Sequence, residues 1–151
     1  MAAQRSRSKK RSAVNYTPAQ PEPLVFFIDR SLGKKTIADA LKQEGAEVYV
    51  HDDLFPADTE DERWLHEVGK RKWVVLTKDL RIRYRTSERL AVKTANIAMF
   101  TLTARDCQGS EMADIFVKAL PRIARFLKKN RPPFIAKVTR RGEVSMLIDL
   151  H

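Results

Sequence analysis

The sequence is poor in cysteine, in glycine and in long apolar runs, and each shortage excludes a class of protein. Its 151 residues include one cysteine, Cys107, which excludes a disulfide framework or a cysteine-based zinc finger and fits a reducing, cytoplasmic setting. The longest apolar runs, such as 24–28 and 73–76, are far shorter than the roughly 18–20 residues of a membrane span. No apolar stretch follows the basic N-terminus, so we expect no secretory signal and no membrane partner.

What the sequence does contain is enough apolar material for one folded domain. Hydrophobic residues make up 43% of the chain, which excludes a wholly disordered protein. The five glycines include no Gly/Ser tract that would separate several domains. The length is typical of a single domain, which we place at residues 23–151.

The charge is strongly positive and unevenly distributed. There are 29 Lys and Arg against 19 Asp and Glu, a formal net charge of +10. Five of the positive charges fall in the first eleven residues among serines, and a Pro-rich stretch follows, so residues 1–22 are predicted to be a disordered basic arm and linker. Two more basic stretches, 70–93 and 118–141, lie inside the folded part. Basic surfaces attract phosphate backbones, although solvated faces would explain the same charges.

The order of the apolar runs predicts the fold class. Continuous apolar runs at 24–28, 48–50, 73–76 and 97–102 are typical of strands buried on both faces. Helical patterns lie between them: one opens at Ser31 and stops at Gly45, one follows a capping box from Thr59 to Glu62, and one spans about 86–94. Strands alternating with helices indicate a three-layer α/β fold, a parallel sheet with crossover helices.

The C-terminal part predicts a long helix and a hairpin. Residues from about 110 to 129 place Phe116 and Ile123 on one face, and Lys118, Arg122 and Arg125 on the opposite face. Pro121 is expected to kink or split this helix. Two short apolar stretches, 134–139 and 143–148, surround Arg141-Gly142 and predict a β-hairpin. We expect this extension, from about residue 110, to complete the domain.

Acidic residues follow each of the first three predicted strands. Asp29 follows the first, Asp52 and Asp53 the second and Asp79 the third, while Asp61 lies in the first turn of the intervening helix. Ligands of a parallel α/β sheet bind outside the carboxyl ends of its strands. Clustered carboxylates repel one another unless a cation compensates them, and Mg²⁺ or Mn²⁺ prefers such oxygen ligands. Next to basic surfaces, this set favours metal-assisted hydrolysis of phosphodiester bonds.

Blander interpretations of the same residues stay open. A single strand-end Asp is often a turn or helix-cap residue, and Asp52 and Asp53 could equally begin a turn. A phosphorelay receiver domain also gathers acids at strand ends, but its Thr/Ser and Lys follow later strands, whereas Thr77 and Lys78 stand beside Asp79. His51 shows no zinc-site spacing and Trp64 suits core packing, so both are expected to be structural.

Three segments carry a resemblance to a known family. Residues 27–33, residues 61–65 and residues 73–79 with the Arg-Ile-Arg at 81–83 make the chain resemble a compact PIN-like ribonuclease, closest to the VapC-type toxin branch. The resemblance covers roughly 24–102. It implies a PIN fold, dependence on Mg²⁺ or Mn²⁺, cleavage of RNA and inhibition by a cognate antitoxin protein. In this resemblance Asp29, Asp61 and Asp79 take the acidic positions, as catalytic residues and metal ligands.

The chain departs from the family pattern after the third acid. Many PIN-like proteins carry a further acid two residues on, where this chain has Arg81, and Glu88 is the candidate to replace it. The further candidates are Asp53 and Thr77, the latter as a partner of a phosphate or a metal-bound water. The expected phosphate-binding residues for the RNA substrate are Arg81, Arg83 and Arg85.

The sequence therefore predicts a metal-dependent endoribonuclease, the toxin of a toxin–antitoxin pair. The alternatives are a PIN-like protein that binds nucleic acid without cutting it, and an interaction module whose acids serve only as caps and turns. Self-association into a homo-oligomer stays open.

Overall fold

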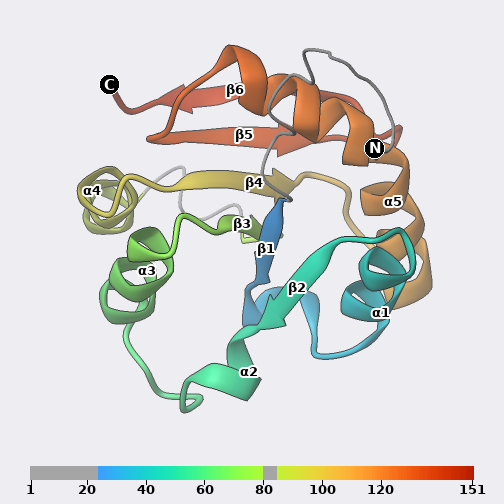
Figure 1. The fold of residues 1–151 in the computed structure, drawn as a ribbon, viewed down its shortest axis with the longest axis horizontal. Helices are drawn as coiled ribbons and strands as arrows, with labels where there is room; N and C mark the ends of the chain where they lie inside the picture. The colour runs from blue at the N-terminus through green and yellow to red at the C-terminus, as the bar shows by residue number, and fades with distance from the viewer. Residues whose placement is uncertain (1–23, 80–84) are drawn as a thin grey trace, which may run out of the picture.

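One six-stranded sheet organises the protein. The computed structural model describes residues 24–79 and 85–151; the predicted arm (1–22), Arg81 and Arg83 lie outside the described residues. The strand order is β2-β1-β3-β4-β5-β6 (Figure 1). The strands are β1 (Val25–Ile28), β2 (Glu47–Val50), β3 (Val74–Thr77), β4 (Ala98–Leu102), β5 (Phe134–Val138) and β6 (Val144–Asp149).

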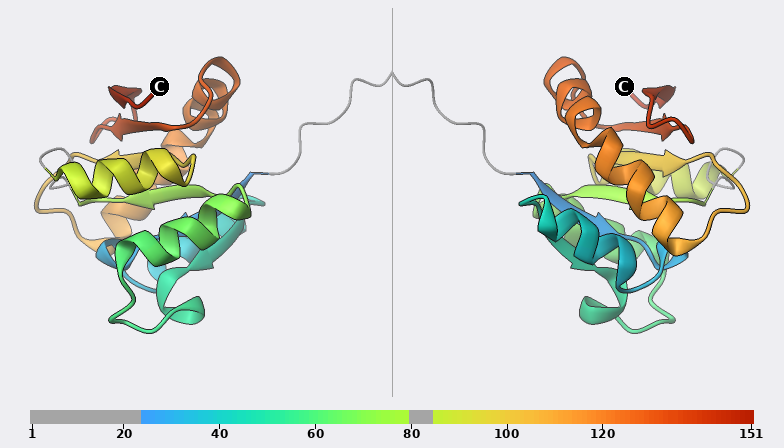
Figure 2. Two further views of the ribbon diagram at one scale, coloured as in Figure 1. Left: turned by 90° about the vertical axis from the view of Figure 1, so that its left-hand side faces the viewer. Right: turned by 90° about the vertical axis from the view of Figure 1, so that its right-hand side faces the viewer.

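Helices cover both faces of this sheet. In Figure 1, α3 and α4 stand on one side of the strands and α1 and α5 on the other, and the two views of Figure 2 each face one of these layers. The helical segments are η1 (Arg30–Leu32), α1 (Thr36–Gln43), α2 (His51–Leu54), α3 (Asp61–Lys70), α4 (Thr86–Thr94) and α5 (Gly109–Lys129). The predicted three-layer α/β class is confirmed.

The direction of the strands also agrees with the prediction. β1 pairs in parallel with both β2 and β3, and β4 pairs in parallel with both β3 and β5. β6 returns antiparallel to β5, which confirms the predicted hairpin. Five parallel strands therefore bring their carboxyl ends to one edge of the sheet.

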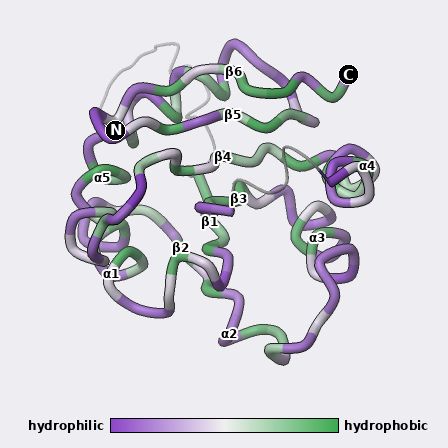
Figure 3. The backbone as a smooth tube through the Cα atoms, turned by 180° about the vertical axis from the view of Figure 1, so that it is seen from behind, coloured by the Kyte–Doolittle hydropathy of each residue, from purple (hydrophilic) through white to green (hydrophobic). Residues whose placement is uncertain are grey.

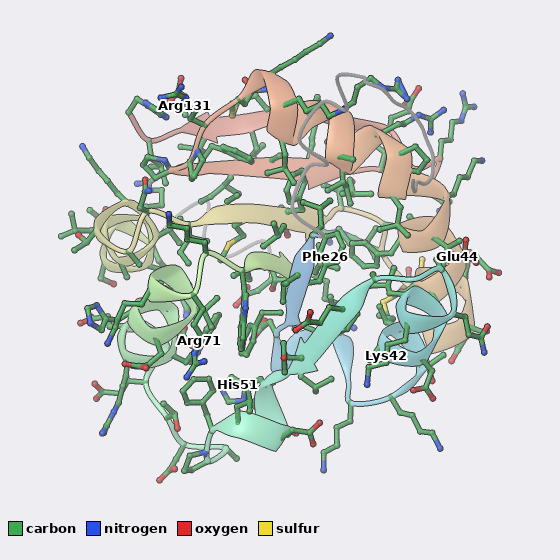
Figure 4. The ribbon with its side chains drawn as sticks, in the orientation of Figure 1. Phe26, Lys42, Glu44, His51, Arg71 and Arg131 are labelled. Atoms are coloured by element: carbon green, nitrogen blue, oxygen red, sulfur yellow. The ribbon has the colours of Figure 1, made fainter. Side chains whose placement is uncertain are left out.

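Each face of the sheet has its own apolar core, because successive side chains of a strand point to opposite faces. Phe26 and Ile28 of β1 belong to the core shared with α1 and α5, whereas Phe27 belongs to the core shared with α3 and α4. All three are at most 1% exposed. Burial on both faces explains why β1, β3 and β4 read as continuous apolar runs. In Figure 3 the tube along β4 is white to green, and Figure 4 labels Phe26.

Two predicted helix starts are wrong. Residues 30–32 form a short 3-10 turn and α1 begins only at Thr36. The predicted capping box at Thr59 is absent, because α3 begins at Asp61 with Glu60 as its N-cap and no side-chain capping bond. The reason lies in the preceding turn: the Thr59 backbone N–H donates to the Pro56 carbonyl at 3.0 Å, so the chain is still turning at that residue.

The long C-terminal helix α5 is not split. It runs unbroken from Gly109 to Lys129 with Pro121 inside it. Pro121 removes one backbone hydrogen bond, but Phe116 before it and Ile123 after it are both 0% exposed in the same core. Packing of both halves against one sheet holds the helix together across the proline.

Arg122 attaches the turn of the C-terminal hairpin to α5. The Arg122 guanidinium donates to the carbonyls of Arg141 and Gly142 at 3.3 and 3.1 Å. Gly142 has φ 78°, a backbone conformation that glycine adopts without strain.

Within the described residues, no helix has both the length and the apolar content needed to cross a membrane.

Candidate active site

A pocket of about 390 Å³ lies where the carboxyl ends of β1 and β3 meet the first turns of α3 and α4. Its lining includes most of the described residues that the sequence singles out. The predicted residues on its wall are Asp29, Asp61, Thr77, Asp79, Arg85 and Glu88. They come from four separate segments, so the fold brings together residues up to 59 positions apart, from Asp29 to Glu88.

Asp29 is held in place by the backbone and by two hydroxyl groups. Its N–H donates to the Leu76 carbonyl at 3.0 Å, which extends the pairing of β1 with β3 by one residue. Its Oδ2 accepts hydrogen bonds from Ser31 Oγ and from Thr77 Oγ1, both at 2.8 Å. Because Thr77 is buried and Ser31 is half-buried, the carboxylate has a defined orientation before any ligand arrives.

The same two hydroxyls connect Asp29 to the segment that carries Asp79. Ser31 Oγ and Thr77 Oγ1 are 3.1 Å apart. The Lys78 N–H donates to Ser31 Oγ and the Asp79 N–H donates to Thr77 Oγ1, each at 3.1 Å. Thr77, which is 3% exposed, therefore acts as a positioning residue between the two acids. Sequence reasoning missed Ser31, although a serine two residues after a strand-end Asp is a signal for such a local bond.

Asp61 is oriented by a tryptophan of its own helix. Trp64 Nε1 donates to Asp61 Oδ1 at 3.0 Å, three residues apart on α3. The indole ring is 4% exposed and stacks on Phe27 with ring centroids 5.2 Å apart. The predicted packing role of Trp64 is confirmed, but its N–H has a second role, which the spacing of the two residues could have indicated.

The two other acids predicted for the site, Glu88 and Asp53, do not have the same environment as Asp29 and Asp61. Glu88 lines the pocket and forms an ion pair with Arg85, with 2.8 Å between Oε1 and the guanidinium nitrogen. That partner neutralises part of the Glu88 charge. Asp53 is exposed on α2 and does not line the pocket.

Arg30 brings a positive charge to the pocket, a feature that sequence reasoning missed. Its Nε donates to Asp52 Oδ1 at 3.0 Å and its terminal nitrogen to the Ala57 carbonyl at 3.1 Å. Burial raises the pKa of Asp52, but a hydrogen bond from His51 and the charges of Arg30 and Lys34 outweigh it, so the pKa lies below its ordinary value. The sequence signal for this positive charge is that Arg30 directly follows the strand-end residue Asp29.

His51, a buried residue, supports the Arg30–Asp52 pair. Its ring is surrounded by Phe27, Phe55 and Trp64, with centroids 5.6–6.1 Å away, and the residue is 1% exposed. Its Nδ1 lies 3.3 Å from Asp52 Oδ1. Figure 4 labels His51. His51 thus has the structural role expected from the sequence, and it also holds Asp52 beside Arg30.

The oxygen atoms that line the pocket suit a hard divalent cation as ligands, but the acidic side chains are too far apart for three of them to share one ion. The carboxylates of Asp29, Asp61 and Asp79 and the hydroxyls beside them offer only oxygen, which Mg²⁺ and Mn²⁺ prefer. Across residues 24–79 and 85–151, however, no three His, Cys, Asp or Glu side chains lie close enough to share one metal ion. An ion bound here would keep several of its waters, as Mg²⁺ usually does.

Comparison with known proteins identifies the family. Residues 24–104, more than half of the chain, match the family described as PIN like domain, so the chain belongs to the PIN-like family. No curated protein and no solved structure matches the chain. The matched region ends just after β4, and α5 with the hairpin lies beyond it.

Proposed function

We propose that this protein is a metal-dependent endoribonuclease that hydrolyses RNA phosphodiester bonds. The observation that carries the proposal is the convergence of Asp29, Asp61 and Asp79 on one pocket at the carboxyl edge of the sheet. PIN-like domains are generally nucleases, and the orientation of Asp29 by two hydroxyls is the preorganisation that such chemistry requires.

The three acids have distinct roles in this proposal. Asp29 and Asp79 would bind Mg²⁺ or Mn²⁺ directly, and Asp61 through a water, because the three carboxylates do not lie close enough to share one ion. The metal would supply an activated water and stabilise the leaving oxygen. Trp64 would keep the Asp61 carboxylate turned toward the pocket through its 3.0 Å hydrogen bond.

Two arginines on the pocket wall fit the substrate phosphate. Arg30 is held by Asp52 and a backbone carbonyl, and Arg85 is held by Glu88. A fixed guanidinium can bind a phosphate through two parallel hydrogen bonds. Arg81 and Arg83 are proposed for the same role from the sequence, and they lie outside the described residues.

The biological role that we propose is the toxin of a toxin–antitoxin pair. It rests on the resemblance to VapC-type toxins at residues 27–33, 61–65 and 73–79. In that role an antitoxin protein would bind the toxin and block RNA cleavage, and the protein would act in the cytoplasm.

A second candidate function is nucleic-acid binding without efficient cleavage. Two observations favour it: Arg81 stands where many relatives have an acid, and the described acids do not form a closed metal-binding group. Both functions keep the basic surfaces and differ only in metal-dependent hydrolysis.

Cleavage of total RNA with and without EDTA tests the proposal. We expect wild-type protein to cut RNA in Mg²⁺ or Mn²⁺, and Asp29→Asn and Asp79→Asn to lose that activity. Asn keeps an acceptor for the Ser31 and Thr77 hydroxyls, so the fold should survive, as far-ultraviolet circular dichroism would show. Asp39→Asn, an exposed acid of α1, is the matched control and should stay active.

Metal binding separates the two candidates. For the nuclease, millimolar Mn²⁺ should raise the melting temperature of wild-type protein, and the increase should disappear in Asp79→Asn. Full activity of both Asn variants in Mg²⁺ would show that the proposed site is wrong. RNA binding without cleavage and without stabilisation by metal would establish the second candidate.

A further inference from the structure

The region beyond the family match carries a long stretch of uncompensated positive charge. Between Ile115 and Arg141 the sequence has nine Lys and Arg and no Asp or Glu. The stretch covers most of α5, all of β5 and the turn of the hairpin. Its charged residues are not scattered over the fold, because α5 and the hairpin turn are attached to each other by Arg122.

The order of the strands connects this charge to the pocket. β1, β3, β4 and β5 are neighbours and run parallel, so the segments that follow them lie side by side along the carboxyl edge. Those segments carry, in spatial order, Asp29, Asp79, Arg105 and Arg140 with Arg141. The edge therefore changes from acidic at the pocket to basic beyond β4. In Figure 1 the arrowheads of β4 and β5 point to the same side of the molecule.

Hydrogen bonds fix the basic end of the edge. Arg140 donates to the Arg105 carbonyl at 2.7 Å and forms an ion pair with Glu111 at 2.6 Å. It thereby joins the segments after β4 and β5 to the first turn of α5. Arg122 is fixed by two carbonyls of the hairpin turn, which hold its guanidinium without neutralising it.

Most of these cations keep their full charge. Within residues 24–79 and 85–151, no ion pair involves Arg105, Lys118, Arg122 or Arg141, and all four are exposed. Lys118 lies against the hairpin turn, since a Cβ on Gly142 would come within 3.3 Å of its Cγ. Cations already held against a rigid turn lose less conformational entropy when they bind a ligand.

We propose that Arg105, Lys118, Arg122, Arg140 and Arg141 form a phosphate-binding track, which leads a single strand of RNA across the carboxyl edge toward the Asp29–Asp79 pocket. The identity of the ligand as RNA rests on the proposed function. A single strand fits because the five cations are gathered at one place, the hairpin turn, where Arg140 contacts Arg105 and where Arg122 and Lys118 contact the turn. Duplex RNA is instead recognised across a groove between two strands.

The test is the salt dependence of RNA binding in EDTA, where metal-dependent cleavage cannot occur. The track variant is Arg105→Gln, Lys118→Gln and Arg141→Gln together, which leaves the structural bonds of Arg122 and Arg140 intact. For a long oligouridylate, three lost phosphate contacts should reduce the slope of log K against log salt by about 2, at about 0.7 per contact for single strands. The melting temperature should not change.

A charge-matched control isolates the position of the charges. The variant Lys70→Gln, Lys72→Gln and Lys93→Gln removes three exposed cations near the ends of α3 and α4, away from the track. We expect its slope to equal that of the wild type. Equal losses in both triple variants would show a general effect of net charge and overturn the proposal.

A dinucleotide separates failure of the track from failure of the proposed nuclease. It has one phosphodiester bond and so no second phosphate for the track when that bond lies in the pocket, and it should be cut in Mg²⁺ equally well by wild type and track variant. If nothing is cut but the slope still falls with the long strand, the nuclease is wrong and the track stands. An unchanged slope for the track variant would overturn the track. So would polyglutamate that binds more tightly than RNA and loses affinity equally in the track variant, because the ligand of the cations would then be an acidic protein.

Discussion

The family-matched region and the C-terminal segment differ sharply in charge but share one core. Residues 24–104 contain 14 Lys and Arg against 13 Asp and Glu, whereas residues 105–151 contain 10 against 5. Yet α5 packs on α1, and β5 pairs with β4 over five residues. Packing therefore joins the two regions that charge separates, and the hydrophobic core extends beyond the family match.

The difference in charge suggests that the two regions have different roles within one fold. The matched region supplies the acidic pocket between β1, β3, α3 and α4. The C-terminal segment supplies nine of the 22 buried residues of one core, and a basic outer surface. Addition of α5 and the hairpin protects β4, which would otherwise be an apolar edge strand open to aggregation.

The largest expected effect comes from cutting the chain between the two regions. A chain that ends at Ala104 loses the burial of Phe116, Ile123 and Phe134, each 0% exposed and each worth about 1.5–3 kcal/mol. A domain has about 5–15 kcal/mol in total, so we expect an insoluble or molten product. Thermal unfolding followed by circular dichroism is the measurement, with deletion of residues 1–12 as the control that should melt like wild type. Cooperative melting of the short chain near the wild-type temperature would show that the segment is an appendage.

A smaller effect on stability is expected from adding a methyl group between the helices of each layer. Gly69 of α3 lies so close to α4 that an added Cβ would collide with the Ala95 carbonyl oxygen. Gly69→Ala should destabilise the protein by about 1–3 kcal/mol, although alanine favours helices by about 1 kcal/mol. In the other layer, the nearest neighbour of a Cβ in Gly109→Ala would be Thr36 at 3.7 Å, an ordinary van der Waals contact, so this change should be neutral or stabilising. Urea unfolding of both variants measures the difference, and equal stabilities would mean that α3 and α4 have room to separate.

The smallest effect concerns acid stability at the pocket rim. The pKa of Asp52 is held below its ordinary value of 3.8, so its ionised form favours the folded state. That contribution is complete above the unfolded pKa of about 3.8 and disappears as pH falls through the lower folded pKa. Asp52→Asn should therefore melt slightly below wild type near neutral pH, and the gap should close in acid. A gap that is constant with pH would assign the effect to packing.

Much of the fold follows from the order of apolar runs. Continuous runs at β1, β3 and β4 can be satisfied only by burial on both faces, and helical patterns between them require parallel crossovers. The hairpin followed in the same way from two short strands around Arg141-Gly142. Because parallel strands end at one edge, sequence spacing also predicted that Asp29 and Asp79 lie near each other.

Tertiary structure alone decided how those residues are connected. The bonds from Ser31 and Thr77 to Asp29 depend on the register of β1 with β3, and the Arg30–Asp52 pair depends on where α2 begins. Local patterns do not specify strand register or the residue at which a helix begins. For that reason the predicted cap at Thr59 was wrong, and Asp53 does not line the pocket. The sequence determined which chemical groups stand at the carboxyl edge, and the packing of strands and helices decided which of them meet, because contacts between distant segments exist only once the sheet is assembled.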